Sequence, residues 1–208
     1  MKKRIISLFL SALCVCSFAF GCNGTSGTQT STGTAREKYR YTKGVHNLTA
    51  PEANTYMVEN GKCDYQILLP ANMDSNLIVA EAELKYFFEE ATGVKLSSVI
   101  EPKEGMAHTA EGKYISIGST KMFESAGIDL KGGGLGSEGG RIVTKDKTVY
   151  VTGATPTAAL NAVYTFLNIM FDYEQFAYDC FTLTETNNAK LRNFDVVDVP
   201  DIEMRACP

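Results

Sequence analysis

The sequence predicts an α+β fold, a two-layer sandwich in which a mixed β-sheet carries two main helices largely on one face. Apolar residues recur at three- and four-residue spacing in two segments, 77–92 and 156–170, as they do in amphipathic helices. Short apolar or alternating runs of strand length separate these helices, and two of the runs flank a tight turn at 145–147. A hairpin inside an otherwise alternating α and β order favours a mixed sheet over a purely parallel one.

The first predicted strand, 66–69, is a short apolar run that Pro70 closes. The helix over 77–92 follows it, with Ser75 or Asn76 as the expected N-cap and Gly93 as the C-terminal stop. The apolar face of this helix contains Leu77, Ala80, Leu84, Phe87, Phe88 and Ala91. Its charged residues lie on the opposite face, which we expect to be exposed to solvent.

Strands are predicted next at 94–96 and 114–117, followed by a hairpin of 141–144 and 148–151. The second helix opens at Thr155-Pro156, a capping hydroxyl followed by proline at the first helical position. Its apolar positions are Ala159, Leu160, Val163, Tyr164, Phe166, Leu167 and Met170. Because they cover more than half of its circumference, this helix is expected to be central and buried. Later strands are predicted at 180–183 and 194–199.

The N-terminus has the pattern of a bacterial lipoprotein signal, which we place at residues 1–21. Lys2-Lys3-Arg4 precedes an apolar stretch over 5–20 that is shorter than the roughly 20 residues of a membrane span. Small residues then lead to Cys22, which we expect to be lipidated; the alternative is an ordinary secretory signal with an incidental cysteine. Residues 22–37, rich in Gly, Ser and Thr, are predicted to be a tether, and 38–199 one domain. The expected location is extracytoplasmic, anchored to the bacterial cell membrane.

The charge balance excludes one class of partner. The chain has 20 Lys and Arg against 24 Asp and Glu, and three of the basic residues lie in the signal, so the remainder is clearly acidic. Such a chain lacks the basic surface that nucleic acids require. Membrane contact is therefore expected only through the lipid at Cys22.

Three cysteines remain in the folded part: Cys63, Cys180 and Cys207. Partly buried, unpaired thiols are the favoured interpretation, and a Cys63–Cys180 disulfide is the alternative outside the cytoplasm. Neither the cysteines nor the two histidines, His46 and His108, have metal-ligand spacing, so no metal site and no cofactor are predicted.

Two other patterns are weighed against structural explanations. Residues 134–139 match G-x-G-x-x-G, but they lead into a hairpin instead of a helix, so we interpret them as a surface loop. Asp172 and Glu174 are two residues apart after the second helix, and we interpret them as solvated loop carboxylates. The sequence predicts no catalytic residue in the chain.

Three segments resemble the N-terminal accessory domains of glycoside hydrolases. Residues 84–94 resemble their "LxxYLxxxTG" helix, 115–118 their "IxIG" strand, and 163–167 their "VYxFL" helix. Such domains precede the catalytic barrel in family 67 α-glucuronidases, family 20 β-hexosaminidases and related uncharacterised bacterial surface proteins. The resemblance covers about residues 54–205 and implies an α+β domain without catalytic residues of its own.

The C-terminal residues carry one further resemblance. Residues 198–206 resemble the "DxPxFxxRG" segment that opens the barrel of family 20 enzymes, so 200–208 would begin a following barrel. The resemblance implies that Arg205 binds substrate hydroxyls in a complete parent protein. Ile202 and Ala206 depart from the pattern, and residues 171–176 lack the Gly-x-Arg-Trp-like segment common in such families.

We therefore expect a non-catalytic accessory domain of a cell-surface, carbohydrate-processing lipoprotein that meets polysaccharide or oligosaccharide through its parent protein. The parent would be α-glucuronidase-like or hexosaminidase-like. The alternative is a self-standing surface lipoprotein that binds glycan or a protein partner without catalysis. The coding DNA beyond Pro208 distinguishes the two, since an open frame supports the first and a stop codon the second.

Overall fold

A computed structural model describes residues 48–130, 135–177 and 180–199. The strands are β1 (Glu52–Val58), β2 (Gln66–Leu69), β3 (Ser97–Ile100), β4 (Tyr114–Ile117), β5 (Gly140–Lys145), β6 (Thr148–Gly153), β7 (Glu174–Ala177), β8 (Cys180–Thr182), β9 (Ala189–Arg192) and β10 (Asp195–Asp198). The helices are α2 (Ser75–Thr92), α3 (Lys121–Ser125) and α4 (Pro156–Phe171).

The central sheet has six strands in the order β10-β5-β6-β4-β2-β3. Strands β3, β2, β4 and β6 run parallel, whereas β5 pairs antiparallel with both β6 and β10. The sheet is therefore mixed, and the β5–β6 hairpin is the element that breaks the parallel order. Two small antiparallel sheets, β1-β9 and β7-β8, flank it.

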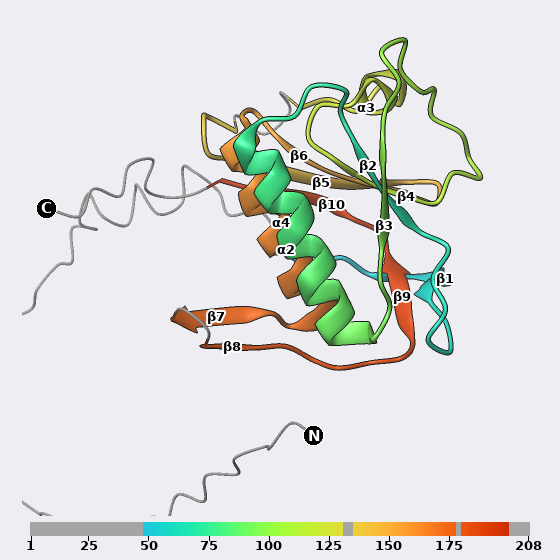
Figure 1. The fold of residues 1–208 in the computed structure, drawn as a ribbon, viewed down its shortest axis with the longest axis vertical. Coiled ribbons are helices and arrows are strands. Elements are labelled where there is room, and N and C mark those ends of the chain that lie inside the picture. The colour runs from blue at the N-terminus through green and yellow to red at the C-terminus, as the bar shows by residue number, and fades with distance from the viewer. Residues whose placement is uncertain (1–47, 131–134, 178–179, 200–208) are drawn as a thin grey trace, which may run out of the picture.

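Helices α2 and α4 lie side by side across one face of the central sheet (Figure 1). All six apolar residues predicted for the first helix are buried, as are Ala159, Val163, Phe166 and Leu167 of α4. The glycines of the underlying strands allow close packing, because a Cβ on Gly153 would lie only 2.4 Å from Ala158 Cβ. The predicted α+β sandwich with two main helices on one face is thus confirmed.

The helix termini follow the predicted capping, with one correction. Thr155 caps α4 by accepting a hydrogen bond from Ala158 N, and Gly93 ends α2 in the left-handed conformation. The N-cap of α2 is Asp74, however, and not Ser75 or Asn76; its carboxylate accepts from Asn76 N at 2.8 Å. An aspartate one residue earlier satisfies the same free backbone donors, so the helix starts earlier than its apolar pattern indicates.

The opposite face of the sheet is covered by α3 and the long segment that precedes β4. Buried Leu68 and Tyr150 of the sheet pack there against Met122, Phe123 and Ala126. Helix α3 was not predicted, because its five residues are too few to show a periodic pattern.

The strand predictions were right for the hairpin and for β2, β4, β8 and β10, but wrong at 94–96. The third strand instead occupies 97–100, where each residue pairs in register with β2. Strands β1, β7 and β9 were missed. They belong to the small flanking sheets, where the pairing is irregular. β1 and β7 are mostly exposed, whereas β9 alternates between buried and half-buried positions over only four residues.

Candidate functional site

In the part of the chain that the structure describes, a concavity lies at each end of the parallel strands. The smaller, about 190 Å³, lies at the carboxyl ends of β2, β4 and β6, between the N-termini of α2 and α4. Its capping side chains already have hydrogen-bond partners. The Asp74 carboxylate accepts from Asn76 N. The Thr155 hydroxyl accepts from Ala158 N and donates to the Ser137 carbonyl. The larger, about 760 Å³, lies at the amino ends of the same strands. We call it the amino-end cleft and take it as the candidate site.

The topology explains how the amino-end cleft forms. Asp64 and Tyr65 immediately precede β2, Lys113 precedes β4, and Lys147 precedes β6. Because these strands are parallel, the residues just before them meet at one edge of the sheet. The second wall is β1 and the turn that follows it, which contribute Asn54, Thr55, Tyr56, Met57, Glu59, Asn60 and Lys62.

The turn after β1 has a defined conformation. Its central residues, Asn60 and Gly61, both have positive φ values, 49° and 70°, as a type I′ hairpin turn requires. Asn60 N donates to Asn188 Oδ1 and Gly61 N donates to the Asn187 carbonyl, each at 2.9 Å. The segment before β9 thus fixes the turn that carries Glu59 and Lys62.

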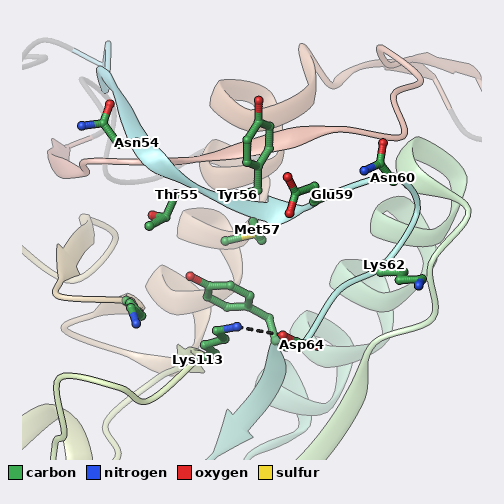
Figure 2. Close-up of a pocket in the computed structure, with 11 residues that line it drawn as sticks. Asn54, Thr55, Tyr56, Met57, Glu59, Asn60, Lys62, Asp64 and Lys113 are labelled. Atoms are coloured by element: carbon green, nitrogen blue, oxygen red, sulfur yellow. Dashed lines mark hydrogen bonds and ion pairs between the residues drawn. The ribbon is translucent and has the colours of Figure 1, made fainter.

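The polar groups of the cleft are arranged around one ion pair (Figure 2). Lys113 Nζ donates to Asp64 Oδ2 at 2.7 Å. This hydrogen bond lowers the pKa of the Asp64 carboxyl below its usual range and raises the pKa of Lys113 above its own. Both groups therefore stay charged at neutral pH, the first as an acceptor and the second as a donor.

Aromatic rings contribute in two different ways. Burial raises the pKa of Tyr65 to about 12, so its phenol stays neutral beside the ion pair. Thr55 and Met57 point from β1 to the side on which Lys113 lies, whereas Tyr56 points to the other side of the strand (Figure 2). Tyr56 is 41% exposed, and its ring is directed away from the ion pair.

A second group of rings lies where the helices end and has a structural explanation. Phe181 of β8 packs edge-on against Phe87 at 5.1 Å and lies 6.1 Å from Tyr173. Thr184 N and Thr186 N also donate to the carbonyls of Phe171 and Ala91 at the helix ends. These contacts attach the β7-β8 hairpin to the helix layer, and the hairpin lies beside the helix ends in Figure 1.

Of the residues that the sequence analysis singled out, those that the structure describes do not line the amino-end cleft. Cys22 and Arg205, together with His46 and Cys207, are outside the described residues. Asp172 caps the end of α4 in the left-handed conformation and accepts a hydrogen bond from Thr184, while Glu174 is exposed at the start of β7. Cys63 and Cys180 are free thiols.

The described part of the glycine-rich segment agrees with the interpretation as a loop. Gly139 N bonds the Leu135 carbonyl at 3.0 Å in a turn that leads directly into β5. Across the described ranges 48–130, 135–177 and 180–199, no group of His, Cys, Asp or Glu residues could hold a metal ion. Within these same ranges, no helix has the length and apolarity needed to cross a membrane.

Sequence reasoning missed the cleft because its parts are far apart in the chain. Asp64 and Lys113 are separated by 49 residues, and neither belongs to a motif. The one local signal was Asn60-Gly61, a dipeptide typical of tight hairpin turns.

Comparisons with known proteins give similarities in fold alone. No family model and no curated protein match the sequence. The GH20 β-N-acetylhexosaminidase of Streptomyces coelicolor A3(2) is similar at 14% identity and TM-score 0.42, over 74% of this chain and 25% of that one. The Flavobacterium johnsoniae chitobiase is similar at 12% identity and TM-score 0.40, over 74% of this chain and 20% of that one. The GH20 exo-β-N-acetylglucosaminidase of Vibrio harveyi is similar at 12% identity and TM-score 0.38, over 74% of this chain and 19% of that one. The chain thus spans a quarter or less of each of these proteins.

Proposed function

We propose that this domain binds glycan in the amino-end cleft, as a non-catalytic accessory domain of a cell-surface, carbohydrate-processing lipoprotein. The observation that carries the proposal is the paired donor and acceptor of Lys113 and Asp64, 2.7 Å apart in an open polar cleft. Neighbouring sugar hydroxyls both donate and accept hydrogen bonds, so such a pair suits two adjacent hydroxyls. The resemblance of residues 84–94, 115–118 and 163–167 to accessory domains supports the same conclusion.

The electrostatics of the cleft suit binding better than hydrolysis. Glycosidases use a pair of positioned carboxyl groups, and the one that acts as an acid has a raised pKa. Lys113 instead lowers the pKa of Asp64 and keeps it ionised. Asp64 is therefore a hydrogen-bond acceptor and not a proton donor.

The test is binding of defined oligosaccharides to the purified protein. Cellohexaose, xylohexaose, chitohexaose and mannohexaose are titrated by calorimetry against wild type and Lys113→Ala. We expect one of them to bind, and the substitution to weaken it by about tenfold, or about 1.4 kcal/mol. Lys103→Ala, an exposed lysine outside the cleft, is the matched control and should bind as wild type. Equal binding by both variants would place the glycan elsewhere, and hydrolysis of any hexasaccharide would refute the non-catalytic role.

Membrane anchoring through Cys22 is part of the proposal. Cells grown with a fatty-acid analogue should label the wild-type protein, and Cys22→Ala should abolish the label and release the protein from the membrane. Two acyl chains are expected, since a single chain gives only marginal anchoring. Unlabelled wild-type protein, cleaved at another position and found in the medium, would disprove the lipoprotein assignment.

Arg205 is proposed as a substrate-binding residue of the complete parent protein. A guanidinium presents a fixed fork of donors to adjacent sugar oxygens. In that protein, Arg205→Ala should lower glycan binding or turnover at least tenfold, by about 1.4 kcal/mol or more, while the melting temperature stays unchanged. An unchanged affinity and turnover would mean that the arginine has no role in the site.

A further inference from the structure

His108 connects four parts of the molecule through its backbone and both ring nitrogens. It lies in the segment between β3 and β4, and only 9% of its side chain is exposed. Nδ1 is 2.7 Å from the Tyr150 hydroxyl of β6, and Nε2 is 2.8 Å from Asp146 Oδ2 in the β5–β6 turn. Its backbone N–H donates to Ser125 Oγ of α3 at 2.8 Å. A surface histidine with ordinary solvation would not have both ring nitrogens engaged.

These contacts hold in both charge states of the imidazole, but with different strength. Burial raises the pKa of Tyr150 to about 12, so its hydroxyl remains protonated and can either donate to a neutral imidazole or accept from an imidazolium. The Asp146 carboxylate accepts a hydrogen bond from Nε2 in either state, but only the imidazolium also forms an ion pair with it, which adds Coulomb attraction. Protonation therefore strengthens the connection between the β5–β6 turn and the segment before β4.

The connection leads directly to the amino-end cleft. Lys147, which lines the cleft, follows Asp146 in the turn, and Lys113 ends the segment that contains His108. Two further contacts join the same pieces, an ion pair between Lys147 and Glu111 and a hydrogen bond of 2.8 Å from Thr148 Oγ1 to the Gly112 carbonyl. The position of Lys147 relative to Lys113 is therefore set by this group of contacts.

The charged and titratable groups around His108 have distinct charge behaviour. Asp146, Lys147 and Lys145 come from the turn and its flanking strand, Glu111 from the segment before β4, and Tyr150 from β6. Imidazole is the side chain whose ordinary titration falls between about pH 5 and 8, where carboxylates, ammonium groups and a buried phenol keep one charge state.

We propose that His108 is a positioning residue of the amino-end cleft, which holds Lys147 and Lys113 in place more firmly when its ring is protonated. Its consequence for affinity rests on the proposed glycan-binding function, whereas its consequence for the two lysines does not. The backbone amide signals of the two lysines should therefore change when His108 is protonated, even with no ligand present.

The first experiment follows the purified protein without ligand by NMR, from about pH 5 to 8. In wild type, the backbone amide shifts of Lys113 and Lys147 should change together with the His108 ring signals. This pH-dependent change in the amide shifts should be absent in His108→Gln and present in His46→Gln, the control substitution at the other histidine. Amide shifts that ignore the titration of His108 would overturn the proposal.

The turn offers variants that do not disturb the core. Asp146 is half exposed and has φ 52°, a conformation that Asn and Gly tolerate and Ala does not. Asp146→Asn keeps a hydrogen bond to Nε2 but not the charge, so the pH response of Lys147 should be reduced. Asp146→Gly removes both and should abolish it; a full response in Asp146→Gly would contradict the proposal. In His108→Gln, the Tyr150 hydroxyl loses the imidazole as its partner. If that loss prevents folding, the two Asp146 variants still test the proposal.

The second experiment measures glycan affinity at the two ends of the same range. With the hexasaccharide that binds best, wild type should bind about two- to fivefold tighter near pH 5.5 than near pH 8, the range expected for one exposed ion pair. Asp146→Gly should remove the difference, while Asp195→Asn, which breaks an ion pair on β10, should retain it. Binding that is equal at both pH values would overturn the regulatory consequence. Absence of binding by all four sugars would refute the proposed function and leave the NMR result to decide the positioning role.

Discussion

The two faces of the central sheet are stabilised in different ways. On the helix face, Ile67, Ile115 and Val151 pack against fully buried residues of α2 and α4 such as Phe88 and Phe166. On the opposite face, a smaller apolar cluster is supplemented by specific polar contacts. There Glu101, 4% exposed, receives backbone N–H groups of the α3 N-terminus, and the hydroxyls of Ser116 and Thr120 bond each other at 2.8 Å.

The two faces therefore depend on different kinds of contact. Apolar burial depends on area and tolerates many arrangements, so a continuous apolar stripe is enough to place a helix. A buried carboxylate needs its particular donors, because leaving it unpaired costs more than the bond contributes. We expect the helix face to determine stability and the opposite face to determine the conformation of the segment that leads to the cleft.

The largest effect should come from the helix face. Leu84→Ala or Leu167→Ala removes a fully buried side chain and should lower the free energy of unfolding by about 2–5 kcal/mol. Ile78→Ala on the exposed side of α2 is the control, with an expected change within about 0.5 kcal/mol. Urea denaturation followed by circular dichroism measures both. A loss below about 0.5 kcal/mol at both leucines would mean that the helix faces are assigned wrongly.

Glu101 tests the opposite face. Its Oε1 accepts from Met122 N at 2.9 Å and its Oε2 from Lys121 N at 2.8 Å. Glu101→Gln turns an NH₂ group toward one of these donors and should cost about 1–3 kcal/mol in urea denaturation. Glu104→Gln, an exposed neighbour, should cost almost nothing. If the two variants are equally stable, the carboxylate does not fix α3.

The N-cap of α4 should have a smaller effect. Thr155→Ala leaves Ala158 N without its acceptor at 3.1 Å and should lower stability by about 1 kcal/mol. Thr155→Ser keeps the hydroxyl and should restore most of the loss in the same thermal melts. Equal losses for Ala and Ser would show that the methyl group matters and the cap does not.

The smallest effect concerns reactivity and not stability. Cys63 packs against the helix-face core, and burial raises the pKa of its thiol, whereas Cys180 is exposed on β8. Since the thiolate is the reactive form, iodoacetamide at about pH 8 should modify Cys180 well before Cys63, as peptide mass spectrometry would show. Denaturant should make the two rates similar. Equal rates in the folded protein would contradict the packing of Cys63.

The elements that the sequence predicted well carry their signals locally. Gly93 and Thr155-Pro156 mark the helix ends, and the buried positions of α2 agree with the three- and four-residue spacing. Strand 94–96 was wrong because Val94, Lys95 and Leu96 alternate as strand residues do, while the pairing with β2 begins only at Ser97. Alternation shows which side chains share one face of a strand. It does not show which strand is the pairing partner, so it cannot set the register.

The amino-acid sequence by itself determined the two long helices, the β5–β6 hairpin and the apolar face on which they meet, because periodicity and capping act within a few residues. Only the tertiary structure decided the cleft. Parallel strands bring the residues before β2, β4 and β6 to one edge, so Asp64, Lys113 and Lys147 become neighbours through strand order and not through any motif. His108 likewise meets Asp146 and Tyr150 across 38 and 42 residues of chain, distances over which local patterns carry no information.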